Sequence, residues 1–477
     1  MFEKELADDI KKVALYDEQN ESITYEQLYR ESDRLCEYIP KRSLVFSLCS
    51  NTIGSVMGYV GFLRNHIVPL LLSSHMDKEL LKELLNNYEP AYIWYPSELE
   101  LKSSEFGMKQ VIYQAYGYSL GLLDEKEKTN MKIYDELALL LTTSGSTGSP
   151  KLVRQSYQSI EVNTKQIIEY LQLNAEEKPV TVLPMNYTYG LSVINTHLSV
   201  GATVCLTDKS IMQREFWQFF REQKCTSFSG VPYTYEILDK LRFYRMELPY
   251  LKTLTQAGGK LNPELHKKYA EYARNQGKNF IVMYGQCEAT ARMAYLPPEY
   301  ALEKQGAMGI PVPGGEFTLL DDEGAVIEEP NTPGELVFRG GNVTLGYAQT
   351  REDLQKEDEF LGVLKTGDIA KKDEDGFYYI VGRKKRFLKI FGNRVNLDET
   401  ERLIKGAYPA VECACCGMDD KMQIFINHDR FAEEIRNFVS EKTGLNSVAF
   451  QIRIVDEIPK NESGKILYKE LEKSYGL

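Results

Sequence analysis

The sequence contains few cysteines. Eight cysteines in 477 residues are too sparse to indicate the disulfide framework typical of small secreted proteins. The first residues, MFEKELADDIKK, are acidic and polar, where a secretory signal is basic and then apolar. We therefore expect a protein of a reducing, cytoplasmic compartment.

The sequence also lacks an excess of basic residues and any long apolar run. It has 57 Lys and Arg against 69 Asp and Glu, a net charge of −12 that would repel a polyanion. We therefore expect no nucleic-acid partner and no anionic membrane surface as a partner. The most apolar stretch, 56–72, is interrupted by the sequence RNH at 64–66 and falls short of the ~20 apolar residues that span a membrane.

Short apolar runs alternate with amphipathic helical patterns along most of the chain, which predicts a layered α/β fold. The apolar run 137–141 is followed by the loop TTSGSTGSPK (142–151) and then by a helical pattern that begins at Ser156, so we expect strand, loop and helix in that order. From Gly334 to Ile390, turn residues separate short alternating runs, which predicts antiparallel β hairpins. Further on, we expect a helix at 398–404 and a strand at 411–416.

The loop at 142–151 is suited to bind a polyphosphate. Its glycines let backbone amides converge, its hydroxyl groups can donate hydrogen bonds, and Lys151 adds a positive charge. The spacing is not that of a Walker loop. Taken alone, the loop is equally compatible with a surface turn rich in Ser and Gly.

Six motifs together resemble the adenylate-forming superfamily, which includes acyl-CoA synthetases, peptide-synthetase adenylation domains and luciferases. They are the loop, YGQCE (284–288), TGD (366–368), GR (382–383), KIFGNRV (389–395) and SGK (463–465), in the family's order and across nearly the whole chain. The chain is closest in type to a stand-alone acyl-CoA synthetase. The resemblance implies a large N-terminal domain (1–384) of two α/β lobes and a β subdomain at about 310–384. A small mobile α+β domain (385–477) would follow, with its hinge at Lys385.

The resemblance implies a two-step reaction. A carboxylate attacks the α-phosphate of ATP and releases pyrophosphate, and the thiol of CoA or of carrier-protein phosphopantetheine then attacks the acyl adenylate. Lys465 would bridge the carboxylate and the α-phosphate, although a lysine in this context is ordinarily a surface residue. Glu288 would ligate Mg²⁺ with Thr147 nearby, although a glutamate here could equally be a solvated helix start.

The other implied cofactor contacts fall into three groups. The β- and γ-phosphates would be bound by Ser144, Gly145, Ser146, Thr147, Gly148 and Lys151. The nucleoside and α-phosphate would lie against Ala257, Gly258, Gly259, Tyr284, Gly285, Cys287, Asp368 and Arg383. Gly392 and Arg394 belong to the motif beside the pantetheine tunnel, where a side chain at position 392 would obstruct the thiol. Simple turn or surface roles are the alternatives for Asp368 and Arg383.

The acid would lie near LPMNYTYG (183–190). Amino-acid-activating relatives have an aspartate at the position of Thr188, so we disfavour an α-amino acid, whose ammonium would stay unpaired. The expected pocket consists of Tyr187, Thr188, Tyr189, Ser229, Gly230, Gln286, Ala291 and Arg292. Arg292 could pair with a second carboxylate or a polar tail, and the alternative is an exposed helix arginine.

The sequence departs from the family pattern at two places, and two alternative functions are compatible with it. Cys287 replaces the family threonine, and a thiol is a weaker hydrogen-bond donor. The cysteines of CACC (413–416) fit no usual zinc spacing, so we expect them in the core. The chain could also be a catalytically silent regulator that binds nucleotide or an acyl ligand, or an amide synthetase that uses the same adenylate.

Overall fold

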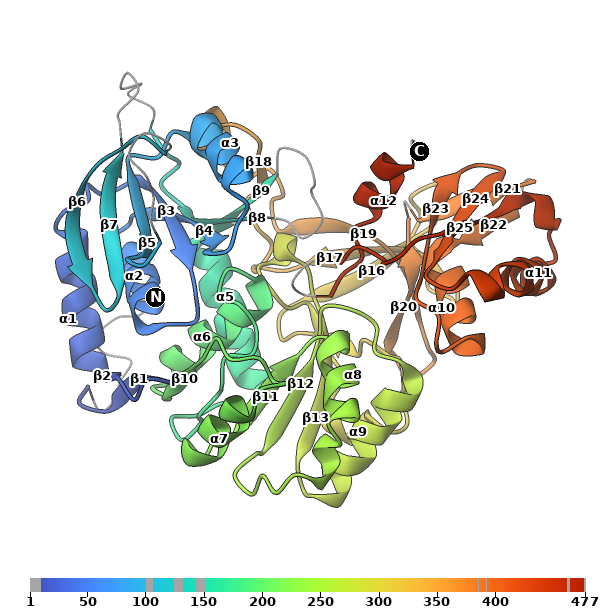
Figure 1. Cartoon of the computed structure of the whole chain (residues 1–477), viewed down its shortest axis with the longest axis horizontal. Coiled ribbons are helices and arrows are strands. Elements are labelled where there is room, and N and C mark those ends of the chain that lie inside the picture. Colours follow the sequence, from blue (N-terminus) through green and yellow to red (C-terminus); the bar gives the residue numbers. More distant parts are fainter. Residues whose placement is uncertain are drawn as a thin grey trace. The chain divides into compact units, whose positions relative to one another are not determined.

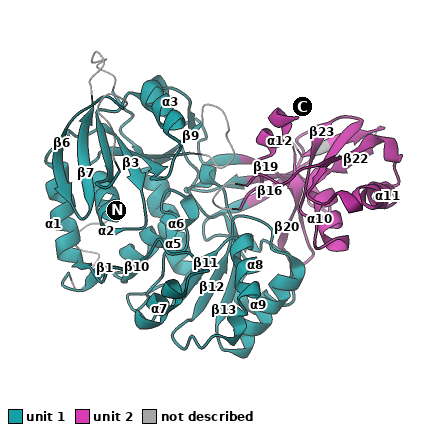
Figure 2. Cartoon of the chain, in the orientation of Figure 1, with its two compact units in different colours: residues 1–144, 149–316, 338–364 teal, residues 145–148, 317–337, 365–477 magenta. Residues whose placement is uncertain are grey.

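The computed structural model describes residues 10–99, 106–123, 132–142, 151–384, 386–391, 393–460 and 464–475. These residues form two compact units, shown in different colours in Figure 2. The first unit lies within 10–142, 151–316 and 338–364, and the second within 317–337 and 365–475. The boundary that we expect at Lys385 falls on a residue outside the described ranges, so it stays a prediction.

An eight-stranded sheet dominates the first unit, in the order β18-β9-β8-β4-β3-β5-β7-β6. Its strands are β3 (Leu44–Cys49), β4 (Val68–Ser73), β5 (Tyr92–Pro96), β6 (Met108–Ala115), β7 (Tyr118–Leu123), β8 (Leu137–Thr142), β9 (Leu152–Ser156) and β18 (Tyr347–Ala348). Phe46 and Leu70 pack with helix α3 (Lys78–Tyr88), whereas Val45 and Leu71 belong to the core that includes α2 (Ile53–Arg64). Helices therefore cover both faces of its central strands, which explains why these strands are continuously apolar.

The first unit also contains a five-stranded sheet, in the order β11-β12-β13-β14-β15. Its strands are β11 (Ser227–Gly230), β12 (Thr253–Gln256), β13 (Asn279–Tyr284), β14 (Ala294–Tyr295) and β15 (Ile310–Pro311). The first three strands are parallel and are connected through helices α8 (Pro232–Lys240) and α9 (Pro263–Asn275), which lie beside them in Figure 1. The carboxyl ends of β11, β12 and β13 therefore lie at one edge of the sheet.

The described part of the first unit also contains a small sheet and further α-helices. The sheet contains β1 (Val13–Asp17), β2 (Ser22–Thr24) and β10 (Val204–Leu206), and the helices are α1 (Tyr25–Cys36), α5 (Tyr157–Leu171), α6 (Thr188–Ser199) and α7 (Arg214–Glu222). Helix α5 begins at a capping box in which the Ser156 hydroxyl accepts a hydrogen bond from the Ser159 amide, 2.9 Å. Helices α5 and α6 pack against each other, and α6 carries the expected acid-binding motif.

The second unit combines antiparallel β hairpins with a small sheet and its accompanying helices. Its strands are β16 (Glu316–Leu320), β17 (Gly334–Arg339), β19 (Val363–Lys372), β20 (Tyr378–Arg383), β21 (Phe387–Ile390), β22 (Asn393–Asn396), β23 (Cys413–Met418), β24 (Lys421–Ile426) and β25 (Phe450–Ile454). Its helices are α10 (Leu397–Ala407), α11 (Ala432–Thr443) and α12 (Tyr468–Ser474). Cys413, Cys415 and Cys416 are buried in β23, as expected for core residues.

Most of the expected elements are confirmed, but one is wrong. The structure has the antiparallel hairpins, a helix at 397–407 and a strand at 413–418, two residues later than expected. However, strand β9 lies between the glycine-rich segment and the helix in the sequence, and it pairs antiparallel with β8, with Thr142 opposite Leu152. The sequence LVRQS does not look like a buried strand, because its Arg and Gln are polar. None of the helices in the described ranges is long and apolar enough to cross a membrane.

Candidate active site

Several expected site residues lie at the carboxyl ends of three neighbouring parallel strands. Ser229 and Gly230 end β11, the segment 257–259 follows β12, and Tyr284 ends β13. Ligands of open α/β sheets bind at this edge because the loops after the strands diverge there. The topology therefore brings together residues that are more than fifty positions apart in the sequence.

The acid-binding motif reaches the same edge through Tyr187. This residue precedes α6, and a Cβ atom at Gly258 would lie only 2.7 Å from its hydroxyl oxygen. Gly258 also has φ +83°, a conformation that favours glycine. Thr188 lies next to Cys287, with 3.5 Å between Oγ1 and Sγ, so the YTYG and YGQCE motifs meet.

Glu288 contacts a tyrosine that the sequence analysis missed. The Tyr347 hydroxyl donates to Oε1 of Glu288, 2.9 Å, and the ammonium of Lys151 lies 5.4 Å from the centre of the same ring. Burial, followed by the charge of Glu288, raises the pKa of Tyr347, which therefore stays a neutral donor. Tyr347 therefore contacts both the Glu288 carboxylate and the Lys151 ammonium. Its only signal in the sequence is a Gly-Tyr pair within a β-rich stretch.

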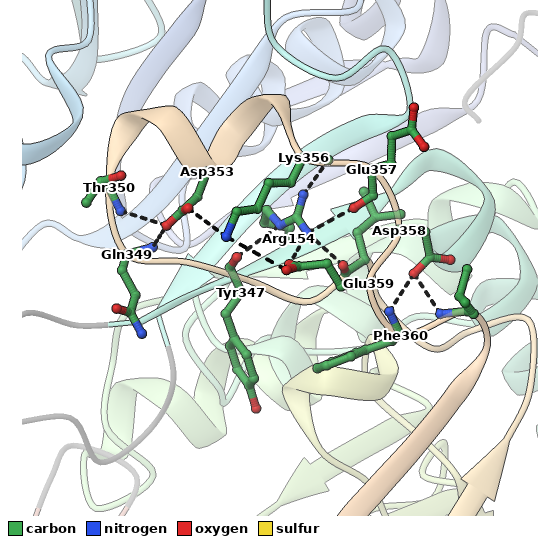
Figure 3. Close-up of polar contacts among 12 residues, drawn as sticks. Arg154, Tyr347, Gln349, Thr350, Asp353, Lys356, Glu357, Asp358, Glu359 and Phe360 are labelled. Atoms are coloured by element: carbon green, nitrogen blue, oxygen red, sulfur yellow. Dashed lines mark hydrogen bonds and ion pairs between the residues drawn. The ribbon is translucent and has the colours of Figure 1, made fainter.

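Tyr347 is fixed in turn by Arg154 of β9. The Arg154 side chain is fully buried, and its guanidinium donates to the carbonyl oxygens of Leu345 (2.8 Å), Tyr347 (3.1 Å), Lys356 (2.5 Å) and Glu357 (3.1 Å). It also forms an ion pair with Glu359, 2.6 Å. Figure 3 shows these contacts, with the Tyr347 ring extending away from the guanidinium. Arg154 therefore attaches the segment 345–359 to the strand after the phosphate-binding loop.

We expect Arg154→Met to lower the free energy of unfolding by about 3–5 kcal/mol, because it leaves a buried set of carbonyl acceptors without donors. Urea unfolding followed by circular dichroism would measure this loss. Glu359→Gln is the matched control. Its side chain is 46% exposed, so we expect a loss of about 1 kcal/mol or less. Equal losses in the two variants would contradict this explanation.

A strained turn separates Glu288 from Arg292. Thr290 has φ 65° and ψ −64°, and the Ala291 amide donates to the Ala289 carbonyl, 2.7 Å, which closes a γ-turn. Such a conformation costs about 1–3 kcal/mol and persists only where its surroundings fix it. The buried Asn342 donates to the carbonyls of Ala289 (3.1 Å) and Arg292 (3.0 Å), and its own carbonyl accepts from the Thr290 hydroxyl (2.8 Å). The turn therefore sets the directions of both side chains.

Arg292 is not an exposed helix residue. It is only 2% exposed and follows the γ-turn, so the alternative of an exposed arginine is wrong, and the pocket role stays a prediction. Ala291 is also buried, and its carbonyl oxygen would lie 1.7 Å from a Cβ atom at Gly285. Position 285 therefore accepts only glycine. Gln286 donates to the Tyr284 hydroxyl, 3.3 Å, and Tyr189 donates to or accepts from Thr255 at 2.8 Å.

The second unit brings Asp368 and Arg383 together. They lie opposite each other on β19 and β20, with 3.3 Å between Nε and Oδ1. The Asp368 side chain is 6% exposed and that of Arg383 is 64% exposed. The Thr366 hydroxyl accepts from the Asp368 amide, 3.1 Å, and fixes the start of the TGD turn. The pair therefore places a buried hydrogen-bond acceptor next to an exposed cation.

Arg386, next to the expected hinge, is bound within the second unit. It forms ion pairs with Asp398 (2.8 Å) and Glu401 (2.6 Å), and its guanidinium carbon lies 3.8 Å from the Tyr468 ring centre. Burial raises the pKa of Glu401, and the charge of Arg386 opposes that shift. The basic run at 384–386 therefore includes a structural arginine.

The remaining expected residues differ in how far they are described. Lys465 is half-buried and precedes Ile466, which forms an antiparallel bridge with Lys460. Ser144, Gly145, Ser146, Thr147, Gly148, Lys385 and Gly392 lie outside the described residues, as does the side chain of Arg394.

Comparisons of the sequence with known proteins agree on one family. The AMP-binding enzyme family matches residues 2–348. An oxalate–CoA ligase of Arabidopsis thaliana is 30% identical over 346 residues, which are 70% of this chain and 66% of that protein. A 2-succinylbenzoate–CoA ligase of Geobacillus sp. (strain WCH70) is 25% identical over 484 residues, 97% of this chain and 94% of that protein.

Solved structures have the same fold. The o-succinylbenzoate CoA synthetase of Bacillus subtilis, in complex with its acyl-adenylate intermediate, superposes with a TM-score of 0.78 and 21% identity. The alignment covers 97% of this chain and 95% of that one. The same enzyme has also been solved with ATP and a magnesium ion, and that structure has a TM-score of 0.78 as well.

Proposed function

The chain belongs to the AMP-binding enzyme family, and on that premise we propose how its residues act in an AMP-forming acid–CoA ligase. A carboxylate oxygen attacks the α-phosphorus of ATP, the bond to the β-phosphate breaks, and pyrophosphate leaves with the bonding electrons. The thiol of CoA then attacks the acyl carbon, and AMP leaves. In the first step two anions must meet, and in each step an anion leaves. The main contribution of the protein is therefore to position groups whose charge neutralises these anions.

The observation that supports this proposal is the group of Glu288, Tyr347 and Lys151 beside the strand ends of the five-stranded sheet. Mg²⁺ is bound with few protein carboxylates, because phosphate oxygens and water complete its octahedron. Glu288 fits this role, since Tyr347 orients one of its oxygens. When bound, the metal would neutralise phosphate charge, and Lys151 would act on the same phosphates.

The other roles form part of the same proposal. Asp368 accepts hydrogen bonds from the ribose, Arg383 contacts the ribose or phosphate, and Lys465 bridges the two reacting anions. Tyr284 and the segment 257–259 flank the adenine. Lys385 is the hinge between an adenylating and a thioester-forming pose, and Gly392 leaves room for pantetheine. A cytoplasmic location, where ATP and CoA are available, is also proposed.

The test is ATP–pyrophosphate exchange with Mg²⁺ over a panel of fatty, aryl, hydroxy, dicarboxylic and amino acids. We expect exchange with one class other than amino acids, because Thr188 offers no carboxylate to an α-ammonium. The preformed adenylate is then offered to CoA, a carrier protein and amines, and we expect transfer to CoA. Exchange with an α-amino acid would contradict the role of Thr188. No exchange with any acid, with ATP binding intact, would favour the silent regulator.

A further inference from the structure

Arg292 is a buried cation, and the groups that contact its guanidinium in the described part of the chain are neutral. Its Nη1 donates to the Tyr170 hydroxyl (3.2 Å) and also contacts the Met283 sulfur, and its Nη2 donates to the Ser192 hydroxyl (2.9 Å). The Tyr189 ring centre lies 4.3 Å from the guanidinium carbon. Nε is buried and has no hydrogen-bond acceptor among the described residues. One edge of the guanidinium, from Nε to Nη2, is therefore incompletely satisfied.

Among the residues that the structure describes, Arg292 forms no ion pair with a carboxylate, and the partners of its guanidinium are two hydroxyl groups, a sulfur atom and an aromatic ring. Arg154 provides the contrast, because it is equally buried but is paired with Glu359. A buried charge without a counter-ion is strongly unfavourable, and proteins keep one where a ligand supplies the opposite charge. The Nε–Nη2 edge has the geometry that pairs side-on with a carboxylate.

Hydrogen bonds with the side chains of two asparagines hold the backbone of Arg292 in place. The Asn163 side chain accepts from the Arg292 amide (3.2 Å) and donates to its carbonyl (2.9 Å), and Asn342 donates to the same carbonyl. The γ-turn at Thr290 fixes the direction from which the side chain starts. Such fixation is typical of a side chain that binds a ligand rather than one that fills space.

The spacing of two residues on helix α6 gives an approximate distance between Arg292 and the proposed reaction centre. Thr188 contacts Cys287, which by the resemblance lies beside the α-phosphate, and Ser192, one turn later, contacts Arg292. Side chains at i and i+4 of a helix lie about 5–6 Å apart. A second anionic group at Arg292 would therefore lie roughly this far from the reacting carboxylate, the span of a chain of about four to six carbons.

We propose that Arg292 selects a short dicarboxylic acid, pairing with the carboxylate that does not react. This inference rests on the proposed function and names its substrate class. The acid enters against Tyr187, whose hydroxyl lies beside Gly258, and its distal carboxylate pairs with the buried, unsatisfied edge of the guanidinium. Monocarboxylic acids of equal length leave that edge unpaired and bind less tightly.

The test compares matched pairs of acids in ATP–pyrophosphate exchange: butyrate with succinate, pentanoate with glutarate, and hexanoate with adipate. We expect kcat/KM to be about 100-fold higher for at least one diacid than for its partner. Arg292→Met should remove this preference through a loss on the diacid, and Arg292→Lys should keep part of it. Arg274→Met, an exposed arginine of α9, is the control and should leave the ratio unchanged. An unchanged ratio in Arg292→Met would overturn the inference.

Thermal unfolding without ATP separates binding from a structural role. We expect Arg292→Met to be at least as stable as the parent protein, because it removes an uncompensated buried charge. The preferred diacid should raise the Tm of the parent and not that of the variant. A strongly destabilised variant that keeps the diacid-induced shift would show a structural arginine and overturn the inference. If no acid supports exchange but the shift depends on Arg292, the proposed catalysis fails while the binding site stands.

Discussion

Replacing Lys465 with alanine is expected to lower acid-dependent ATP–pyrophosphate exchange by about 10²–10³-fold. The carboxylate and the triphosphate repel each other, and the ammonium of Lys465 is the group that we propose between them. Because the thiol attacks an adenylate that is already formed, transfer from preformed acyl-AMP to CoA should fall much less. The two half-reactions would be measured separately, by exchange and by thioester formation.

Lys460→Ala is the matched control for this variant. Lys460 forms the antiparallel bridge with Ile466, the residue after Lys465, and its ammonium pairs with Glu412 at 2.6 Å. We expect its exchange rate to stay within about twofold of the parent, because a partly exposed ion pair contributes little. If Lys465→Ala retained full exchange, or if both variants lost it equally, the proposed role of Lys465 would be wrong.

Glu288→Gln is expected to lower exchange by about 100-fold at a fixed Mg²⁺ concentration and to raise the Mg²⁺ concentration needed for half-maximal rate. The amide keeps the size of the side chain and still offers Tyr347 an acceptor oxygen, so the main change is the lost negative charge. Exchange would be followed over a Mg²⁺ titration at saturating ATP.

Two further variants test whether this loss of exchange is specific to the Glu288 carboxylate. Tyr347→Phe keeps the carboxylate but removes the donor that orients it, and we expect a smaller loss, about tenfold. Glu299→Gln changes an exposed glutamate of the same unit and should have no effect. An unshifted Mg²⁺ dependence in Glu288→Gln would exclude this carboxylate as the metal ligand.

The fold class could be predicted because it is set by local patterns. Buried parallel strands such as β3 and β4 are continuous apolar runs, and their helices have clear caps and faces. Strand β9 could not be predicted, because its polar Arg154 is buried only through acceptors about 190 to 205 residues later in the sequence. Local propensity contains no information on such a contact.

The candidate site was predictable to a similar extent. Motif glycines and carboxylates follow strand ends, and the resemblance supplies their order. Tyr347 was missed because its role depends on Glu288, 59 residues away in the sequence. The burial of Arg292 could not be derived either, since the local sequence ATARMAY is compatible with an exposed or a buried arginine. Its position is decided by Asn163 and Asn342, which lie far from it in the sequence.

The order in which the chain visits its two units has a consequence for biosynthesis. The first unit is interrupted by 317–337 of the second unit and is completed only by 338–364. Until Glu359 has left the ribosome, Arg154 has no counter-ion, and β9 has no β18 to pair with. We therefore expect the first unit to finish folding only after part of the second has been made, although domains usually fold in N-terminal order. A single cut in the gene cannot release both units intact.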